Sequence, residues 1–156
     1  VDIGARNTNM SVVADGFIRI NRNIDVGGAE LTRVISQSMD LDYRRAEDMK
    51  RLQGLAVNGG EKEIVDTMYP ILSKVLVEIE RVMSAYRSRN QREVEKVILV
   101  GGSSQLKGLR DHFNEKLHVQ VEVGDPWHRV DYPEKLQPIL QELAPTFSIA
   151  LGLAMR

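Results

Sequence analysis

The chain of 156 residues contains no cysteine, no large excess of either charge and no long apolar run. Without cysteine it forms no disulfide and no thiolate metal site, which agrees with a reducing cytoplasm. Its net charge of −1 provides no broad basic field, so nucleic acid is not expected as the main partner. No apolar stretch approaches the roughly 20 residues that cross a bilayer, so we expect no direct membrane insertion.

The composition that remains is that of one globular domain. Hydrophobic residues make up 42% of the chain and charged residues 28%, which is ordinary for a packed protein. A chain of this length buries roughly 70% of its unfolded surface. The sequence therefore predicts a single folded unit with a sizeable core.

A buried strand, a glycine pair and a helix start follow one another in the block VILVGGSSQLKGL, which runs from Val97 to Leu109. Because Gly101 and Gly102 carry no side chain, a flat base or a phosphate could lie directly against the backbone there. The same order of elements also makes an ordinary turn between a strand and a helix, and the block alone leaves both interpretations open.

The first residues offer a second candidate for phosphate binding. Asp2 lies in an apolar run, Gly4 follows two residues later and Thr8 four residues after that. A carboxylate can hold magnesium directly or through water, a glycine lets backbone amides approach phosphate oxygens, and a hydroxyl can add a hydrogen bond. The alternative is that Asp2 merely caps a turn.

Two further features lie between these blocks. Gly27 and Gly28 precede an apolar helical pattern, so their amides would stand at a helix N-terminus, where the dipole favours an anion. Glu47 and Lys50 lie three residues apart and share one helix face, where they could contact ribose hydroxyls and a phosphate or the base. Taken alone, this pair is better explained as a solvated surface ion pair.

Local patterns predict the elements that carry these residues. Asp15 and Gly16 join two extended runs as a hairpin turn, and Pro70 is expected to kink or divide a long helix. We expect the last helix after Pro145, and a loop at Trp127 that covers the core or offers a contact patch. The expected ranges are strands at 8–14, 17–26, 95–100 and 118–123, helices at 29–39, 42–53, 61–90 and 106–117, and a loop at 58–60.

The succession of these motifs resembles the second half of the actin, sugar kinase and DnaK-type chaperone superfamily. Within it, the segments VDIGARNT, DVGGAELT, RRAEDMKR and ALGLAMR are most similar to the PilM family of type IV pilus assembly proteins, which is related to the cell-division protein FtsA. The resemblance runs from Val1 to Arg156. It implies an α/β, actin-like (ribonuclease H-like) lobe with a mixed sheet, an N-terminal β-hairpin, flanking helices and a small helical subdomain at about 40–95.

The resemblance also assigns ligands to the motifs, with ATP or ADP and Mg²⁺ as cofactors. It places Asp2 on magnesium, through water, and on the β- and γ-phosphates. It implies that the other contacts come from Gly4 and Thr8 around the phosphates, Gly27 and Gly28 at the ribose and phosphates, Glu47 and Lys50 at the ribose and base edge, Gly101, Gly102 and Ser103 at the α-phosphate and adenine, and Gln105 and Leu106 beside the base.

A complete member of the superfamily begins with a first lobe that carries its own phosphate loop. Val1 starts directly on a strand and is not a methionine, so we expect this chain to be the second lobe of a longer protein. The small residues Ala150, Gly152 and Ala154 suit a hinge helix that packs toward that first lobe. The resemblance further implies a cytoplasmic scaffold at the inner face of the inner membrane, with pilus platform proteins such as PilN as partners.

Two other functions remain open at this stage. One is a lobe of an active ATPase or sugar kinase, for which this half shows no catalytic acid or water-positioning residue. The other is a degenerate actin-like module that is kept for protein contacts. We expect at most slow ATPase activity in the full-length protein, and feeble or no ATP binding by this chain alone, because half of the phosphate contacts would be missing.

Overall fold

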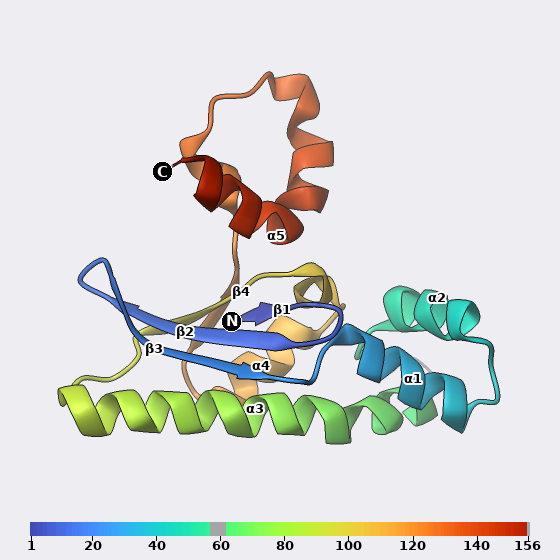
Figure 1. Ribbon diagram of the computed structural model, residues 1–156. Coiled ribbons are helices and arrows are strands. Elements are labelled where there is room, and N and C mark those ends of the chain that lie inside the picture. Colours follow the sequence, from blue (N-terminus) through green and yellow to red (C-terminus); the bar gives the residue numbers. More distant parts are fainter. Residues whose placement is uncertain (57–61, 156) are drawn as a thin grey trace.

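The computed structural model describes residues 1–56 and 62–155 (Figure 1). The predicted loop at 58–60 lies outside these residues. The strands are β1 (Asp2–Ile3), β2 (Thr8–Ala14), β3 (Phe17–Ile24), β4 (Lys96–Leu99) and β5 (Gln120–Val123). The α-helices are α1 (Gly28–Ser38), α2 (Tyr43–Gln53), α3 (Lys62–Asn90), α4 (Leu109–Leu117) and α5 (Gln137–Ala154), and short 3₁₀ turns are η2 (Gly102–Gln105), η3 (Pro126–Arg129) and η4 (Glu134–Leu136).

The strands form a mixed sheet whose two parts meet at β1. Strands β1, β2 and β3 pair antiparallel in that order, and β4 pairs parallel with β5. A single parallel bridge between Asp2 and Val100 joins the two parts. The strand order is therefore β3-β2-β1-β4-β5, which confirms the predicted mixed sheet.

The N-terminal hairpin confirms its sequence signal. Asp15 and Gly16 have φ angles of 54° and 79°, the left-handed values that a type I′ turn requires at both central positions. Strand β2 has the predicted bounds, whereas β3 ends two residues before the predicted end. A register shift between Val12 and Val13 marks a bulge in β2.

Helix α3 lies along one face of the sheet, and α5 lies on the other side of it (Figure 1). The buried stripe of α3, which includes Ile64, Met68 and Val75, belongs to the same apolar core as Met10 and Leu99. The apolar stripe of α3 is therefore a core face. Because α3 packs on the hairpin strands, the boundaries of a separate subdomain at 40–95 stay a prediction.

Pro70 does not divide α3, which runs unbroken over 29 residues. Of the two expected effects, a kink or a division, the division is wrong, and the kink stays a prediction. A proline removes one backbone donor and crowds one earlier carbonyl, but the flanking residues Met68, Ile71 and Leu72 are buried in the core, and their packing stabilises a continuous helix.

Several other boundaries differ from the expected ones. The segment after Gly101 is the 3₁₀ turn η2, and α4 begins only at Leu109, because Gly108 has a left-handed φ of 78° that interrupts the helix. His118 is also left-handed, with φ of 52°, so β5 begins at Gln120 rather than at residue 118. β4 is one residue shorter at each end than predicted.

The C-terminal helix is longer than predicted. It begins at Gln137, with Pro145 inside it, instead of starting after that proline. Trp127 lies in the 3₁₀ turn η3 rather than in an irregular loop, and its indole Nε1 donates to the Leu140 carbonyl at 2.7 Å. Its ring also lies 6.0 Å from the Phe147 ring, so Trp127 covers α5. Of the helices described, none combines the length and hydropathy of a membrane span.

Candidate functional site

Three backbone bends meet at the end of β1. The Gly28 amide donates to the Gly4 carbonyl at 2.9 Å, and the Ala29 amide donates to the Ala5 carbonyl at 2.7 Å. The Ser103 hydroxyl reaches the same Gly4 carbonyl at 3.4 Å. The bends at Gly4, Gly28 and Ser103, which are far apart in the sequence, therefore form one continuous surface.

At most of the glycines of this junction, other protein atoms occupy the space that a side chain would need. A Cβ on Gly27 would lie 2.7 Å from the Gly4 carbonyl oxygen, and one on Gly28 would lie 2.3 Å from the Ser103 hydroxyl. A Cβ on Gly101, whose φ is +85°, would lie 2.3 Å from Asp2 Oδ1. Of the two glycines that the sequence offered as bare backbone for a ligand, Gly101 therefore has its side-chain space filled by Asp2.

Gly102 is the exception. It is exposed, and the nearest atom to a Cβ built there is the Thr146 Cγ2 methyl at 3.5 Å, an ordinary contact distance. Of the two glycines in the block, Gly102 is therefore the one whose Cβ position is free of a clash.

The first turn of α1 does not present free amides. Those of Gly28 and Ala29 donate to the first loop, and that of Glu30 donates to the Gly27 carbonyl at 3.1 Å. Gly27 and Gly28 are themselves buried. The expectation of an anion site at this helix start is wrong for these amides, because they hold the N-terminal loop instead.

Asp2 and Thr8 have different surroundings. Asp2 is partly exposed, at the bridge between β1 and Val100. Thr8 is fully buried, and its hydroxyl donates to the Val26 carbonyl at 2.7 Å. This corrects the prediction that Thr8 contacts a phosphate, because the hydroxyl is committed to closing the hairpin. Among the residues described, no three acidic or histidine side chains gather as a metal site.

Glu47 and Lys50 form a buried network rather than a surface pair. Lys50 is 6% exposed, and its ammonium donates to the Gly28 carbonyl at 3.0 Å, the Thr32 hydroxyl at 2.9 Å and Glu47 Oε2 at 2.6 Å. The Thr32 hydroxyl also donates to Glu47 Oε2, and Arg51 Nε donates to Glu47 Oε1 at 2.7 Å. The network fastens α2 to the glycine bend at the start of α1.

The network changes the acidity of Glu47. Burial alone would raise the pKa of its carboxyl group, but hydrogen bonds from Lys50, Thr32 and Arg51 and the Lys50 charge outweigh that effect. Together they lower the pKa from 4.5 to about 2. Glu47 is therefore ionised throughout the physiological range.

The two predicted residues after the glycine pair differ in exposure. Leu106, predicted beside the base, is 8% exposed and belongs to the core. Gln105 is exposed, and its side-chain amide donates to the Glu142 carbonyl of α5. The Gly101 amide donates to the Pro145 carbonyl at 2.8 Å, so α5 is fastened to the bend by its backbone.

The twelve predicted ligand residues thus fall into two groups. The solvent-accessible ones are Asp2, Gly4, Glu47, Gly102, Ser103 and Gln105, and the buried ones are Thr8, Gly27, Gly28, Lys50, Gly101 and Leu106. The structure brings the three bends together. The buried residues contact the loops that carry the accessible ones and so fix their positions.

Sequence reasoning missed two supporting hydroxyl groups. Thr32 is fully buried between Gly28, Glu47 and Lys50, and Ser104 is 2% exposed and donates to the Gly101 carbonyl at 2.7 Å. Both follow a glycine bend by three or four residues, a spacing at which a hydroxyl reaches back to the backbone. That spacing was a usable signal.

Comparison with known proteins agrees with this geometry. The family model of the type IV pilus assembly protein PilM matches residues 1–156. A chain of a PilM-PilN type IV pilus biogenesis complex matches with a TM-score of 0.84 and 31% identity, over 99% of this chain and 44% of that one. The cell division protein FtsA of Agrobacterium fabrum is 27% identical over 98% of this chain and 38% of its own length.

Structures at lower identity share the fold. The ethanolamine utilization protein EutJ from Carboxydothermus hydrogenoformans has a TM-score of 0.67 at 24% identity, over 96% of this chain and 47% of that one. MreB5 of Spiroplasma citri, bound to ADP, has a TM-score of 0.69 at 15% identity, over 99% and 51%. The chain thus spans about half or less of each of these four proteins. Its fold is actin-like, and the chain belongs to the PilM family of type IV pilus assembly proteins.

Proposed function

We propose that this chain supplies the second phosphate loop and the adenosine loop of an ATP or ADP site in a PilM-type scaffold of type IV pilus assembly. The observation that carries the proposal is the convergence of the bends at Gly4, Gly28 and Ser103, with direct contacts between them. Three separate loops can then touch a single nucleotide.

The accessible groups at this junction fit the parts of a nucleotide. Gly102 offers open backbone to a flat base or an α-phosphate, and the Ser103 hydroxyl lies beside it. Asp2 offers one partly exposed carboxylate. One carboxylate suits Mg²⁺, which keeps several waters and takes its remaining ligands from phosphates. When bound, the ion would neutralise phosphate charge, and Asp2 would orient it through water.

The buried groups have a positioning role in this proposal. Lys50 fixes the Gly28 carbonyl and orients Glu47, whose ionised carboxylate keeps a partly exposed edge for ribose hydroxyls. Thr8 and Gly101 fix β1 and therefore the position of Asp2. No step of hydrolysis is assigned to these residues, and we expect at most slow turnover in the whole protein.

Solved structures of similar proteins support the binding of a nucleotide and of a partner protein. MreB5 of Spiroplasma citri was solved with AMPPNP and with ADP, and a PilM chain was solved with PilN. By analogy we propose a cytoplasmic location at the inner face of the inner membrane, with PilN among the partners.

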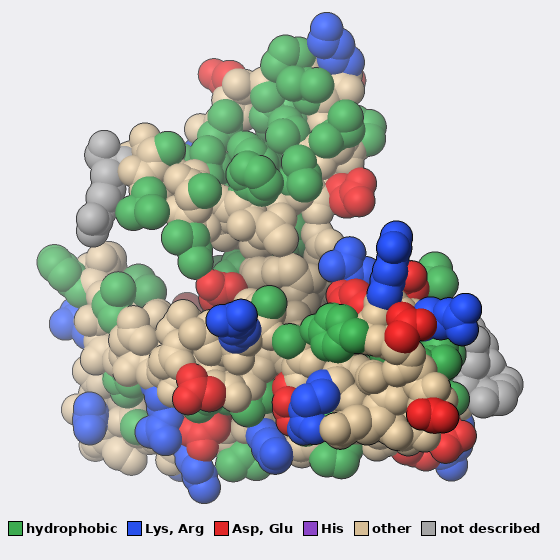
Figure 2. All heavy atoms as spheres, turned by 45° about the vertical axis from the view of Figure 1, so that its right-hand side comes forward, with side chains coloured by type: hydrophobic (Ala, Val, Ile, Leu, Met, Phe, Trp, Pro, Cys, Tyr) green, Lys and Arg blue, Asp and Glu red, His purple; other side chains and the backbone are tan. Residues whose placement is uncertain are grey.

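Helix α5 supports a contact with the first lobe. Figure 2 shows hydrophobic side chains gathered over the upper part of the molecule, where α5 lies. Ile139, Phe147, Ile149 and Leu153 are all exposed there. We propose that this face packs on the first lobe, so that the bound nucleotide and α5 together set the angle between the lobes.

The test is calorimetry of MgATP binding to the whole protein. Asp2→Ala is expected to weaken binding at least about tenfold, because the phosphates and their ion lose a carboxylate, which corresponds to about 1.4 kcal/mol. Asp48→Ala, which removes an exposed carboxylate on α2, is the matched control. Equal affinity in wild type and Asp2→Ala would refute the phosphate-side assignment.

A second candidate function is an actin-like interaction module that binds no nucleotide. The specific observation in its favour is that Lys50, Thr8 and the first amides of α1 are satisfied within the protein. It predicts no heat of ATP binding by the whole protein, with pilus partner binding unchanged by Asp2→Ala.

A further inference from the structure

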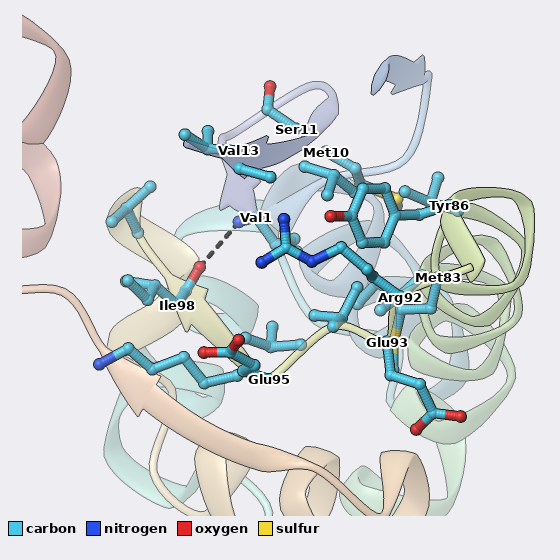
Figure 3. Close-up of a pocket in the computed structure, with 18 of the residues that line it drawn as sticks. Val1, Met10, Ser11, Val13, Met83, Tyr86, Arg92, Glu93, Glu95 and Ile98 are labelled. Atoms are coloured by element: carbon cyan, nitrogen blue, oxygen red, sulfur yellow. Dashed lines mark hydrogen bonds between the residues drawn. The ribbon is translucent and has the colours of Figure 1, made fainter. Parts of the chain in front are cut away.

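A large cavity of this chain lies apart from the bends described above. It has a volume of about 630 Å³ and lies between β2, β4 and the C-terminal half of α3, and Figure 3 shows Val1, Met10, Tyr86 and Ile98 around it. None of the twelve predicted ligand residues, all of which the structure describes, lines this cavity. A nucleotide base that contacts the bends must therefore lie on the surface beside them.

One side chain of α5 lies directly beside the exposed glycine of the bends. The Thr146 methyl carbon Cγ2 is 3.5 Å from the position that a Cβ on Gly102 would take, and both residues are exposed. The Gly101 amide donates to the Pro145 carbonyl at 2.8 Å, which fixes the residue before Thr146 against the glycine pair. The Gly102 backbone and the Thr146 methyl therefore form one continuous surface.

The part of Thr146 that lies beside Gly102 is apolar. The Thr146 hydroxyl donates to the Leu143 carbonyl of its own helix at 2.7 Å. Because a β-branched side chain has few favourable rotamers, this bond also fixes the methyl group in its place beside Gly102. The surface that α5 adds to the glycine bend is therefore a methyl group with a defined position.

This surface adjoins the junction of the three bends. Ser103, the residue after Gly102, has its hydroxyl 3.4 Å from the Gly4 carbonyl. We propose, on the basis of the function proposed above, that the Thr146 methyl contacts the face of the nucleotide base. Helix α5 then contributes a residue to the base subsite, one that the sequence did not predict.

The chemistry of the methyl group favours a base over a phosphate at this place. A methyl offers a phosphate no hydrogen bond and no charge, and it displaces water that would solvate the anion. A purine ring has a broad face of low polarity, and its contact with a methyl removes apolar area of both groups from water. In this arrangement the base lies toward α5 and the phosphates lie toward Asp2.

Calorimetry of MgATP binding to the whole protein tests the contact with two substitutions at one position. Thr146→Ser removes the methyl and keeps the hydroxyl, and we expect the affinity to fall about threefold, the effect of one lost methyl contact. Thr146→Val keeps the methyl and loses the hydroxyl, and as the conservative variant it should rescue the affinity. A loss in Thr146→Val without a loss in Thr146→Ser would assign the contact to the hydroxyl and would overturn the proposal.

Thr67→Ser is the matched control. It removes a methyl from a threonine of α3 whose hydroxyl donates to the Glu63 carbonyl at 2.8 Å, the same kind of bond within a helix, and it should leave MgATP affinity unchanged. Inorganic tripolyphosphate, which has no base, is the second probe, and its binding should be equal in wild type and Thr146→Ser. An equal loss for both ligands would show that the methyl only shapes the protein, which would overturn the proposal.

The wild type separates this proposal from the one on which it rests. If the wild type binds no MgATP, the proposed function fails and the base contact fails with it. If the wild type binds MgATP and Thr146→Ser binds it equally well, only the base contact is refuted. Weaker binding of MgATP by Thr146→Ser, with rescue by Thr146→Val and unchanged binding of tripolyphosphate, would support it.

Discussion

The ammonium of Lys50 lies 2.6 Å from Glu47 Oε2, and the two charges share a site that is largely closed to water. Through Lys50, this pair also holds the Gly28 carbonyl at the start of α1. A surface ion pair would contribute little to stability. This pair instead determines how α2 sits against the glycine bend, and it can be tested directly.

Lys50→Met is expected to destabilise the fold by about 3–5 kcal/mol, because Glu47 would lose its partner at a mostly buried position. Urea unfolding at pH 7 measures the change. Arg51→Met, which removes a 75% exposed guanidinium from the same carboxylate, is the control and should cost under about 1 kcal/mol. Equal losses in the two variants would contradict the buried network.

Stability should fall in acid because of Glu47. Its pKa is about 2 in the folded protein and 4.5 without the network, so the unfolded chain binds the proton first as the pH drops. The contribution is complete above pH 4.5 and is lost as the pH falls toward 2. Urea unfolding of wild type and Glu47→Gln over this range measures it. The difference between them should shrink in acid, and a constant difference would contradict the assignment.

Gly101→Ala should destabilise the fold by at least about 3 kcal/mol, from a left-handed backbone and from crowding together. The added Cβ would lie 2.3 Å from Asp2 Oδ1 and 2.7 Å from the Ile3 carbonyl oxygen. Gly16→Ala is the control, because its φ is +79° with no atom within 4 Å. It should cost about 1–2 kcal/mol in thermal or urea unfolding. A cost for Gly101→Ala no larger than that would refute the close packing.

The only tryptophan of the chain reports on the C-terminal helix. Phe147→Ala should shift the fluorescence of Trp127 to longer wavelength, because the ring 6.0 Å away would be replaced by water. Ile149→Ala removes a 60% exposed side chain of the same helix and should leave the emission unchanged. An unchanged spectrum for Phe147→Ala would show that the two rings do not pack in solution.

The sequence predicts local features well where one residue type decides them. Asp15 and Gly16 fix the hairpin turn because both adopt positive φ, and the alternation in β2 follows from its half-buried face. The expectations at Pro70 and Pro145 were less successful, because contacts with other elements decide the structure there. Their local penalty is outweighed by tertiary contacts, since each lies inside a helix that packs on other elements.

The order of the glycine motifs also predicts that distant bends converge. It does not predict the role of each residue, because a bare backbone looks the same in sequence whether a ligand or another loop lies against it. Gly28 and Gly102 belong to similar glycine pairs, yet a Cβ would clash at Gly28 and would make only an ordinary contact at Gly102. The sequence does not show that Lys50 is buried either, because its burial depends on Thr32 in a different helix.

The bond from the Gly101 amide to the Pro145 carbonyl has a mechanical consequence. A side-chain contact can rotate away under load, whereas this link joins main chain to main chain. Tension applied to α5 is therefore transmitted to the bend that touches Asp2 and Ile3. Because Pro145 lies in the middle of α5, a shift of this helix would displace the backbone of the glycine turn as well.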